Sequence, residues 1–223
     1  MIEGTIRILC DNALKRRVAD NLAAFDVREH ADAAVTRAAV AITVVDSVPG
    51  GDGLGIPGND GEAVLILTRR AHGLKAHSGQ WALPGGRVEE DETPEETALR
   101  ELEEEVGLRL SEERIMGRLD DFTTRSGFTI TPVVVWGGAG VNLTADPAEV
   151  ASIHRIPIAE FMRTDAPILE KNPSGGAPIL FMPVASSWIA APTAALIYQF
   201  REVAILGRHT RVAHFDQPAF AWR

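Results

Sequence analysis

The sequence predicts an α+β fold of the broad α/β class, in which a mixed sheet lies between helices. The stretches "AVAITVVDS" (39–47) and "AVLILTRR" (63–70) are β-branched, apolar runs typical of strands. Helical spacing of apolar residues occurs towards both ends of the chain and in a glutamate-rich stretch near its middle. Because these strands and helices alternate irregularly, we expect a mixed sheet rather than a regular series of parallel βαβ units.

The first predicted element is a packing helix over residues 11–25, where apolar residues recur at helical spacing and Asp11 or Asn12 can serve as the N-cap. The stretch between the two strands, residues 49–62, is too rich in glycine and proline to be anything but a loop. It contains "GLGIPG" (53–58), which has the spacing of a dinucleotide-binding loop. Such a loop needs a helix after it, and here a second strand follows, so the glycines indicate a connection only.

The elements after the glutamate-rich stretch are predicted from similar patterns. Strands are expected in "RIMGRLDDF" (114–122) and "FTITPVVVWGG" (128–138), then a turn, a short strand and the start of a helix in 146–161, and a hairpin around "NPSGG" in 168–184. A last helix is expected from Pro192, as its first helical residue, to about Leu206, ended by Gly207. We expect one domain over 1–223, with a core at about 36–165, the N-terminal helix 11–25 and a hairpin and helix in 166–223.

Composition and charge restrict the class of protein. The formal net charge of −9 argues against a surface that binds nucleic acid or anionic lipid, because both depend on basic patches. Cys10 is the single cysteine, so no disulfide can form within the chain. No run of about 18 apolar residues occurs, and charged residues interrupt the first thirty positions, which argues against a membrane span or signal peptide. We expect a cytoplasmic protein.

The stretch "TPEETALRELEEEVGL" (93–108) has firm helix boundaries. Thr93 and Glu96 have the spacing of a capping box, and Pro94 suits the first helical position. Gly107 is suited to end the helix in the left-handed conformation, which glycine adopts at little cost.

The residues of this helix divide into faces. At about 100° per residue, one side gathers apolar residues and another gathers Glu101, Glu104 and Glu105. Like charges three and four residues apart destabilise an isolated helix by about 0.2–0.5 kcal/mol per pair. A divalent cation such as Mg²⁺, which prefers oxygen ligands, would neutralise them. From composition alone, a solvated acidic face is the more common explanation.

The spacing of the whole segment resembles the Nudix box. From Gly86, five residues lead to Glu92, and seven more lead to "RELEEEVGL" (100–108), with every defined position matched. The resemblance implies a Nudix-type α/β/α sandwich and a magnesium or manganese ion held by Glu101, Glu104 and Glu105. It also implies that Arg100 pairs with Glu92 to hold the loop against the helix, while Gly86 and Gly107 shape the motif.

Two candidates for the general base follow from the resemblance. Glu101 is favoured, and Glu149, which precedes the strand expected in 146–161, is the alternative. Glu95 and Glu103 have no assigned role, and we expect both to face solvent.

The segment before the box resembles the additional signature of the coenzyme A diphosphatase branch of the family. It reads "LTRRA" (67–71), three residues, Lys75, three residues, Gly79, three residues and "LPGG" (83–86). Lys75 stands where that signature has arginine, and Leu83 stands where it has phenylalanine. Lysine keeps the charge but lacks the planar fork that suits a phosphate.

Substrate contacts are expected from Arg70 and Lys75 in this segment and from Gly85 and Gly86 in its last part, "LPGG" (83–86), which is called the glycine loop below. For Arg70, a solvent-facing strand residue is an equally good explanation. His72 and His77 have no third metal-binding partner nearby in the sequence, so we expect surface or loop-packing histidines.

The expected function is metal-dependent hydrolysis of a diphosphate linkage in a nucleoside diphosphate derivative. The resemblance implies coenzyme A or an acyl-CoA as the substrate, with 3′,5′-ADP and (acyl-)4′-phosphopantetheine as products. ADP-ribose, NADH or another nucleotide is the alternative, and a non-catalytic nucleotide-sensing module is a third. A small nucleotide is the expected partner, without nucleic acid or membrane. The helix at 192–206 and the terminal "FDQPAFAWR" can pack on the core or on a second copy in a homodimer.

Overall fold

A mixed sheet forms the centre of the protein, in a computed structural model that describes residues 7–30, 36–48, 54–56, 59–72, 79–173 and 175–221. In this part of the chain the sheet has eight strands, in which β3, β2, β1, β7 and β5 lie in that order, while β4 pairs with β1, β6 with β7 and β8 with β2. Their bounds are β1 Thr36–Asp46, β2 Ala63–Arg70, β3 Trp81–Ala82, β4 Gly85–Arg87, β5 Ile115–Arg118, β6 Phe122–Thr123, β7 Phe128–Gly138 and β8 Val150–Pro157.

The sheet contains both parallel and antiparallel pairs, and its central strands do not alternate between apolar and polar residues. β1 and β7 are parallel, whereas β2 is antiparallel to both β1 and β8. The middle of β1, β2 and β7 is buried on both faces, as strands at the centre of a covered sheet usually are. The predicted mixed sheet is therefore confirmed, and the apolar runs reflect burial from two sides.

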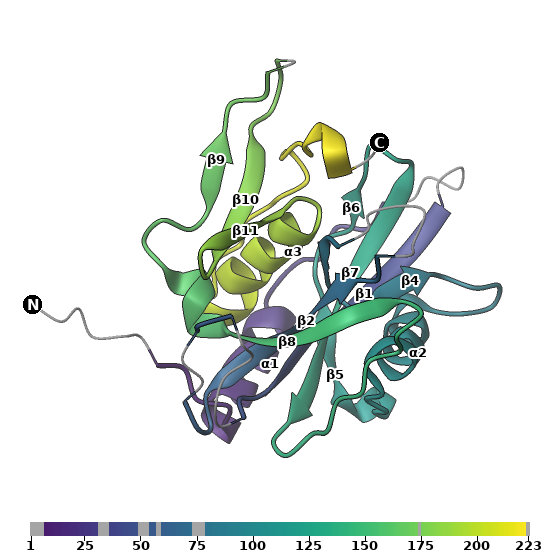
Figure 1. Cartoon of the computed structure of the whole chain (residues 1–223), viewed down its shortest axis with the longest axis vertical. Helices are drawn as coiled ribbons and strands as arrows, with labels where there is room; N and C mark the ends of the chain where they lie inside the picture. Colours follow the sequence, from purple (N-terminus) through teal and green to yellow (C-terminus); the bar gives the residue numbers. More distant parts are fainter. Residues whose placement is uncertain are drawn as a thin grey trace, which may run out of the picture.

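Helices cover both faces of this sheet (Figure 1). α2 (Pro94–Val106) lies on one face, while α1 (Asn12–Ala23), α3 (Thr193–Phe200) and η3, a π-helix (Arg201–Ile205), lie on the other. Neighbouring residues of β2 point to opposite layers, since Val64 joins the cluster around α2 and Leu65 joins the larger cluster on the other face. The protein is thus an α/β/α sandwich, and none of the helices among the described residues is long and apolar enough to cross a membrane.

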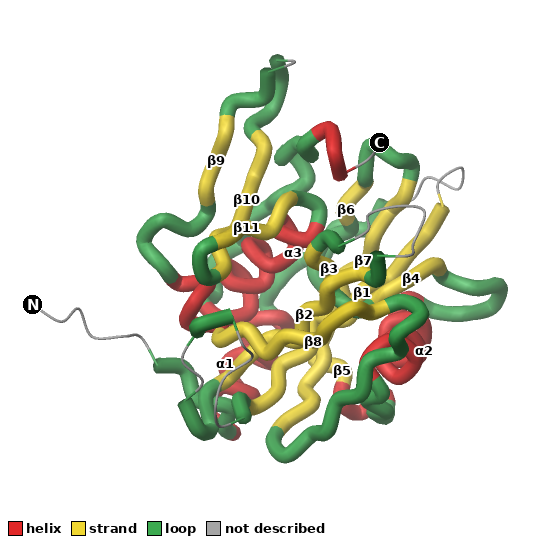
Figure 2. Tube along the Cα trace, viewed as in Figure 1, coloured by secondary structure: helices red, strands yellow, loops and turns green. Residues whose placement is uncertain are grey.

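The C-terminal part adds a second, smaller sheet. β9 (Ile168–Glu170), β10 (Ile179–Val184) and β11 (Ser187–Ala190) form an antiparallel sheet that lies beside α3, away from α2 (Figure 2). The hairpin predicted for 168–184 is confirmed by the pairing of β9 with β10. A short helix, η4 (Ala219–Ala221), follows near the C-terminus.

The predicted C-terminal helix differs from the structure in detail. Pro192 is the N-cap rather than the first helical residue, and the last turn is the π-helix η3. In η3 the side chain of Arg201 is buried, and its Nη1 donates to the carbonyl oxygens of Phe161 at 3.1 Å and Ala166 at 2.8 Å. These hydrogen bonds connect the C-terminal helix to the segment that follows β8. No local sequence pattern predicts them.

Two further predictions need correction. The helix expected at the end of 146–161 is a 3₁₀-helix, η2 (Ile158–Met162). The strand expected over 114–122 begins after a 3₁₀-helix, η1 (Glu112–Arg114), and is split into β5 and β6. At the split, Asp120 and Asp121 are buried and accept hydrogen bonds from the backbone N–H groups of Arg28 at 2.9 Å and His30 at 2.8 Å.

Candidate functional site

Gly85 and Gly86 begin β4, and neither position has space for a side chain. β4 pairs with β1 so closely that a Cβ on Gly85 would lie 2.4 Å from the carbonyl oxygen of Ala39. A Cβ on Gly86 would lie 2.0 Å from Oε1 of Glu101. Gly85 therefore allows the strand pairing, while Gly86 lets the carboxylate of Glu101 rest against the loop backbone.

The ends of α2 are as the sequence predicts. Glu96 Oε2 accepts a hydrogen bond from the backbone N–H of Thr93 at 2.7 Å, and the backbone N–H of Glu96 donates to Thr93 Oγ1 at 3.2 Å. Gly107 caps the other end in the left-handed conformation, with φ of 69°. These caps fix the first and last turns and hence the direction of the glutamate side chains between them.

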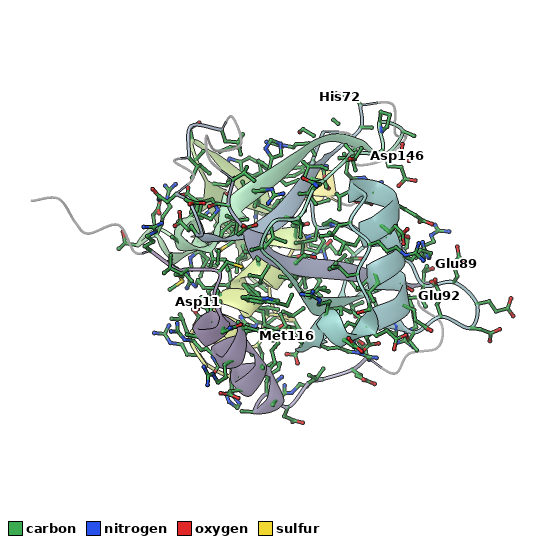
Figure 3. The ribbon with its side chains drawn as sticks, turned by 90° about the horizontal axis from the view of Figure 1, so that it is seen from below. Asp11, His72, Glu89, Glu92, Met116 and Asp146 are labelled. Atoms are coloured by element: carbon green, nitrogen blue, oxygen red, sulfur yellow. The ribbon has the colours of Figure 1, made fainter. Side chains whose placement is uncertain are left out.

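Arg100 and Glu92 form the ion pair that the box resemblance implies. Arg100 donates from Nε to Glu92 Oε1 at 2.8 Å and from Nη2 to Glu92 Oε2 at 3.0 Å. The same Nη2 donates to the carbonyl oxygen of Arg87 at 3.1 Å, and Thr97 Oγ1 donates to Glu92 at 2.8 Å. The bonds from Arg100 lower the pKa of Glu92 to about 2. Figure 3 shows Glu92 beside α2, in the loop that precedes it.

Arg100 also contacts two of the proposed metal ligands. Its Nη1 donates to Glu101 Oε1 at 2.8 Å and to Glu104 Oε2 at 3.0 Å. The side chain of Glu101 is 12% exposed, whereas that of Glu104 is 59% exposed. Burial raises the pKa of Glu101 even though Arg100 opposes the shift. Glu101 thus lies inside the site, and Glu104 lies at its solvent side.

Glu105 is the most deeply buried carboxyl group of the site, with 3% of the residue exposed. Burial raises its pKa to about 8, and the charges of Glu101 and Glu149 act in the same direction. Arg70 and the backbone N–H of Gly85 lower it but do not compensate. The negative charges of Glu101 and Glu149 therefore disfavour the ionised form of Glu105, and the positive charge of Arg70 does not offset this together with burial.

Arg70 and Glu149 approach this region from the sheet. Arg70 is the last residue of β2, and Glu149 is the residue before β8, where its carbonyl oxygen accepts from the N–H of Ala71 at 2.8 Å. Arg70 Nε is buried and has no hydrogen-bond partner among the described residues. An arginine with an unsatisfied donor next to carboxyl groups is suited to bind an oxygen-rich ligand.

The donor set fits a hard divalent cation, because carboxylate oxygens are the ligands that Mg²⁺ and Mn²⁺ take. As the side chains lie, however, no three histidine, cysteine, aspartate or glutamate residues in the described ranges are grouped closely enough to hold a metal ion. The carboxylate of Glu104 contacts Arg100 at the solvent side instead. The metal role of Glu101, Glu104 and Glu105 stays a prediction.

Lys75, His77 and part of the loop 53–58 are outside the described residues, and His72 is exposed. Glu103 is 48% exposed, as expected. The expectation that Glu95 faces solvent is wrong.

Glu95 is instead bound by Arg118 of β5 through two guanidinium nitrogens, and the side chain of Glu95 is 24% exposed. Arg118 also donates to Glu29 at 3.2 Å, so this arginine connects the start of α2 to the segment after α1. The two partners are 23 residues apart in the sequence, so their contact depends on the tertiary fold.

The sequence of the site region matches a known protein family. The NUDIX domain profile matches residues 53–173, which include the glycine loop, α2 and β8. The chain belongs to the Nudix family. It is 40% identical over 103 residues to a Yersinia enterocolitica protein named "Uncharacterized Nudix hydrolase NudL", a match that covers 46% of this chain and 53% of the relative.

A protein of the same name from Photorhabdus laumondii is 40% identical over 97 residues, covering 43% of this chain and 52% of the relative. The match spans about half the length of these curated relatives. Among solved structures, the NUDIX domain of Shewanella oneidensis NrtR, complexed with ADP ribose, is similar with a TM-score of 0.47 and 21% identity, covering 82% of this chain and 96% of that one. A MutT/nudix family protein from Enterococcus faecalis has a TM-score of 0.46 at 17% identity, covering 74% of this chain and 53% of that one.

Proposed function

We propose that this chain is a divalent-metal-dependent Nudix hydrolase that cleaves the diphosphate linkage of a nucleoside diphosphate derivative. Its proposed substrate is coenzyme A or an acyl-CoA, with 3′,5′-ADP and (acyl-)4′-phosphopantetheine as products. The observation that carries the proposal is a set of three residues: Glu101 rests against Gly86, Glu105 is buried beside Gly85, and Arg70 is close enough to lower the pKa of Glu105. This group combines oxygen donors with a cationic side chain, which suits a metal-bound diphosphate.

The proposed ligands of the ion are Glu101, Glu104 and Glu105. When bound, Mg²⁺ or Mn²⁺ would neutralise phosphate charge and lower the pKa of a bound water. The chain's own residues position the diphosphate. Arg70 offers its Nε–H to a phosphate oxygen. Gly85 and Gly86 are proposed to bring the diphosphate close to Glu105, which accepts a hydrogen bond from the backbone of Gly85, and to Glu101, which lies against Gly86.

Glu101 is the proposed general base, and Glu149 is the alternative. Burial raises the pKa of Glu101, which makes its carboxylate a better proton acceptor at neutral pH. Glu149 is exposed at the start of β8 but close enough for its charge to raise the pKa values of Glu101 and Glu105. Comparing kcat for Glu101→Gln and Glu149→Gln at saturating magnesium would distinguish the two. Turnover of Glu101→Gln within a few-fold of the unmodified protein would end the Glu101 assignment.

A direct substrate screen tests the proposed function. Coenzyme A, acetyl-CoA, ADP-ribose, NADH and a diadenosine polyphosphate would each be incubated with the protein and Mg²⁺ or Mn²⁺, and the products identified by mass. We expect coenzyme A or its ester to give 3′,5′-ADP with the highest kcat/KM. Cleavage of ADP-ribose or NADH alone would overturn the coenzyme A assignment. Absence of cleavage of every nucleotide would overturn the hydrolase assignment and favour the nucleotide-sensing alternative.

We also propose that residues 1–223 fold as one domain, with the Nudix core at about 36–165. Support comes from the buried contacts of Arg201 with the carbonyl oxygens of Phe161 and Ala166, which tie the C-terminal part to the core. A single unfolding transition, coincident by circular dichroism and tryptophan fluorescence, is the expected result. Two separated transitions would contradict it.

A further inference from the structure

The C-terminal part of the protein contains a pocket of about 460 Å³ that the proposed hydrolytic site does not use. Its walls come from the β9–β11 sheet, from the segment 217–220 and from the turn between β6 and β7; they include Arg125, Glu170, Phe181, Trp188, Gln217 and Phe220. Its volume is in the range of pockets that hold small organic ligands, which is about 300–1,000 Å³. Among the described residues, none of those proposed above to bind metal or diphosphate lines it.

Aromatic side chains dominate one part of this pocket. Trp188 is 48% exposed and Phe220 is 46% exposed, although both belong to the least water-soluble types of side chain. Their ring centroids are 5.8 Å apart, and Phe181 supports Trp188 edge-on at 5.0 Å. Trp188 and Phe220 are thus two adjacent exposed rings, and Phe181 packs against Trp188. Such a pair offers a surface on which a flat ring can stack.

One residue of the pocket wall, Gln217, has a buried hydrogen-bond acceptor without a partner in the part of the chain that the structure describes. Gln217 is only 5% exposed, and its Oε1 has no hydrogen-bond partner among the described residues. Because buried acceptors in folded proteins are nearly always satisfied, this oxygen points to a donor that the chain itself does not provide. Gln217 also lines the pocket, so a bound molecule can supply that donor.

The charges around the pocket favour a neutral donor rather than an anion. Arg125 donates from Nε to Asp216 Oδ1 at 2.5 Å and is further bound by the second carboxylate oxygen. Asp216 also accepts a hydrogen bond from Asn172, so the nearby positive charge is compensated. Glu170 adds a second acceptor to the wall. A flat ring that carries N–H donors therefore matches the pocket better than a phosphate does.

We propose that this pocket binds an amino-substituted purine ring of the adenine type. The ring stacks on Trp188 and Phe220, and its exocyclic amino group donates a hydrogen bond to Gln217 Oε1. The ring has two conceivable sources with the same chemistry: the base of the hydrolysed nucleotide, in which case the inference rests on the proposed function, or a separate nucleotide.

Direct binding tests the pocket without any turnover. Adenosine and purine riboside differ by the exocyclic amino group, and their dissociation constants would be measured by calorimetry for the unmodified chain, Trp188→Ala and Gln217→Leu. Leu169→Ala is the matched control, because Leu169 is also an exposed apolar residue of the small sheet, at 51%, but does not line the pocket. Circular dichroism and melting temperature would verify that each variant is folded.

We expect adenosine to bind the unmodified chain and Leu169→Ala equally within twofold, and to bind Trp188→Ala and Gln217→Leu at least tenfold more weakly. Purine riboside should bind the unmodified chain at least tenfold more weakly than adenosine. The proposal is overturned if folded Trp188→Ala and Gln217→Leu bind adenosine like the control, if purine riboside binds as well as adenosine, or if adenosine does not bind at millimolar concentration.

A hydrolysis assay then distinguishes the two sources. If adenosine inhibits competitively and Trp188→Ala raises KM with kcat within twofold, the pocket holds the base of the substrate. If adenosine binds without affecting KM, the pocket serves a separate nucleotide, and the proposal stands. Adenosine binding in a protein that cleaves no nucleotide also supports the pocket, while the proposed hydrolase function alone would fail.

Discussion

Arg100 binds Glu92 with two parallel hydrogen bonds, Nε to Oε1 at 2.8 Å and Nη2 to Oε2 at 3.0 Å. Both side chains are about three-quarters buried or more, with exposures of 24% and 20%. Because Nη2 also reaches the carbonyl oxygen of Arg87, this one guanidinium fixes the loop before α2 against the helix. The planar fork of arginine is needed for this set of contacts, and lysine cannot reproduce it.

Arg100→Lys should therefore lower kcat/KM by about tenfold or more, because a small displacement of the loop misplaces the groups around it. The free energy of unfolding should fall by about 1 kcal/mol, as for a partly exposed ion pair. Steady-state kinetics and urea unfolding measure the two effects. Arg109→Lys is the matched control, since Arg109 is 84% exposed and lies just past the same helix. Equal kcat/KM values for Arg100→Lys and Arg109→Lys would show that the planar guanidinium of Arg100 has no role in activity.

The ion pair should also give the protein an acid-sensitive component of stability. Hydrogen bonds from Arg100 lower the pKa of Glu92 from the ordinary 4.5 to about 2 in the folded state. A depressed carboxyl pKa stabilises the fold above pH 4.5, and this stabilisation is lost as the pH falls from there towards 2. With solvent screening we expect about 1 kcal/mol. The difference in unfolding free energy between the unmodified chain and Glu92→Gln should shrink over this window, and a constant difference would contradict the assignment.

Glu105 should have the opposite effect in metal-free protein. Burial raises its pKa from 4.5 to about 8, so its contribution to stability is complete below pH 4.5 and is lost as the pH rises through 8. Glu105→Gln resembles the protonated form of Glu105. At pH 9 its free energy of unfolding should exceed that of the unmodified chain by about 3 kcal/mol, whereas at pH 4 the two should be similar. Urea unfolding in the presence of a chelator measures this. Equal stabilities at pH 9 would count against a buried, charge-destabilised Glu105.

Divalent metal should stabilise the protein through the same carboxyl groups. A ligand at 100 times its Kd stabilises the folded state by about 2.7 kcal/mol, which corresponds to about 5–10 °C in Tm for a domain of this size. We expect this shift with Mg²⁺ or Mn²⁺ for the unmodified chain, and less than half of it for Glu101→Gln and Glu105→Gln.

Glu103→Gln is the control for charge and helix position, because Glu103 is on α2 but 48% exposed and turned towards Arg109, 3.7 Å away. It should keep the whole metal-induced shift in Tm. A similar loss for Glu103→Gln would mean that the metal responds to the general charge of the helix rather than to a defined site.

The two glycines of the loop should respond differently to an added methyl group. At Gly85 the new Cβ would meet backbone atoms of Ala39 and Val40, at 2.4 and 2.7 Å, which cannot move easily. Gly85→Ala should therefore reduce the free energy of unfolding by about 2 kcal/mol or more. At Gly86 the nearest atoms belong to the side chain of Glu101, which can rotate away. Gly86→Ala should therefore keep most of the stability but lose kcat, and the reverse order of effects would contradict these roles.

The parts of the site that the sequence predicts correctly are those determined within a few residues. The capping box needs only Thr93 and Glu96, and the left-handed end needs only Gly107, so both follow from local chemistry. The face shared by Glu101 and Glu105 follows from helix geometry alone. The buried runs of β2 and β7 are also local, and their predicted bounds agree with the structure.

The remaining features depend on contacts between distant segments. Glu95 is bound by Arg118 of β5, which is distant in the sequence. The buried Asp120 accepts hydrogen bonds from Arg28, Gln199 and Arg211, which lie in three distant segments. The contact of Arg100 with Glu104, which holds that carboxylate at the solvent side, is local in sequence but competes with the expected metal role. Helix periodicity predicts which glutamates share a face of α2, but it does not predict the hydrogen-bond partner of each carboxylate.

The position of Arg100 among Glu92, Glu101 and Glu104 has a consequence for the order of events in this protein. The guanidinium acts as an internal counter-ion, so the acidic helix can fold before any metal arrives. If these carboxylates bind metal as proposed, removal of the metal would return them to the arginine and leave α2 folded.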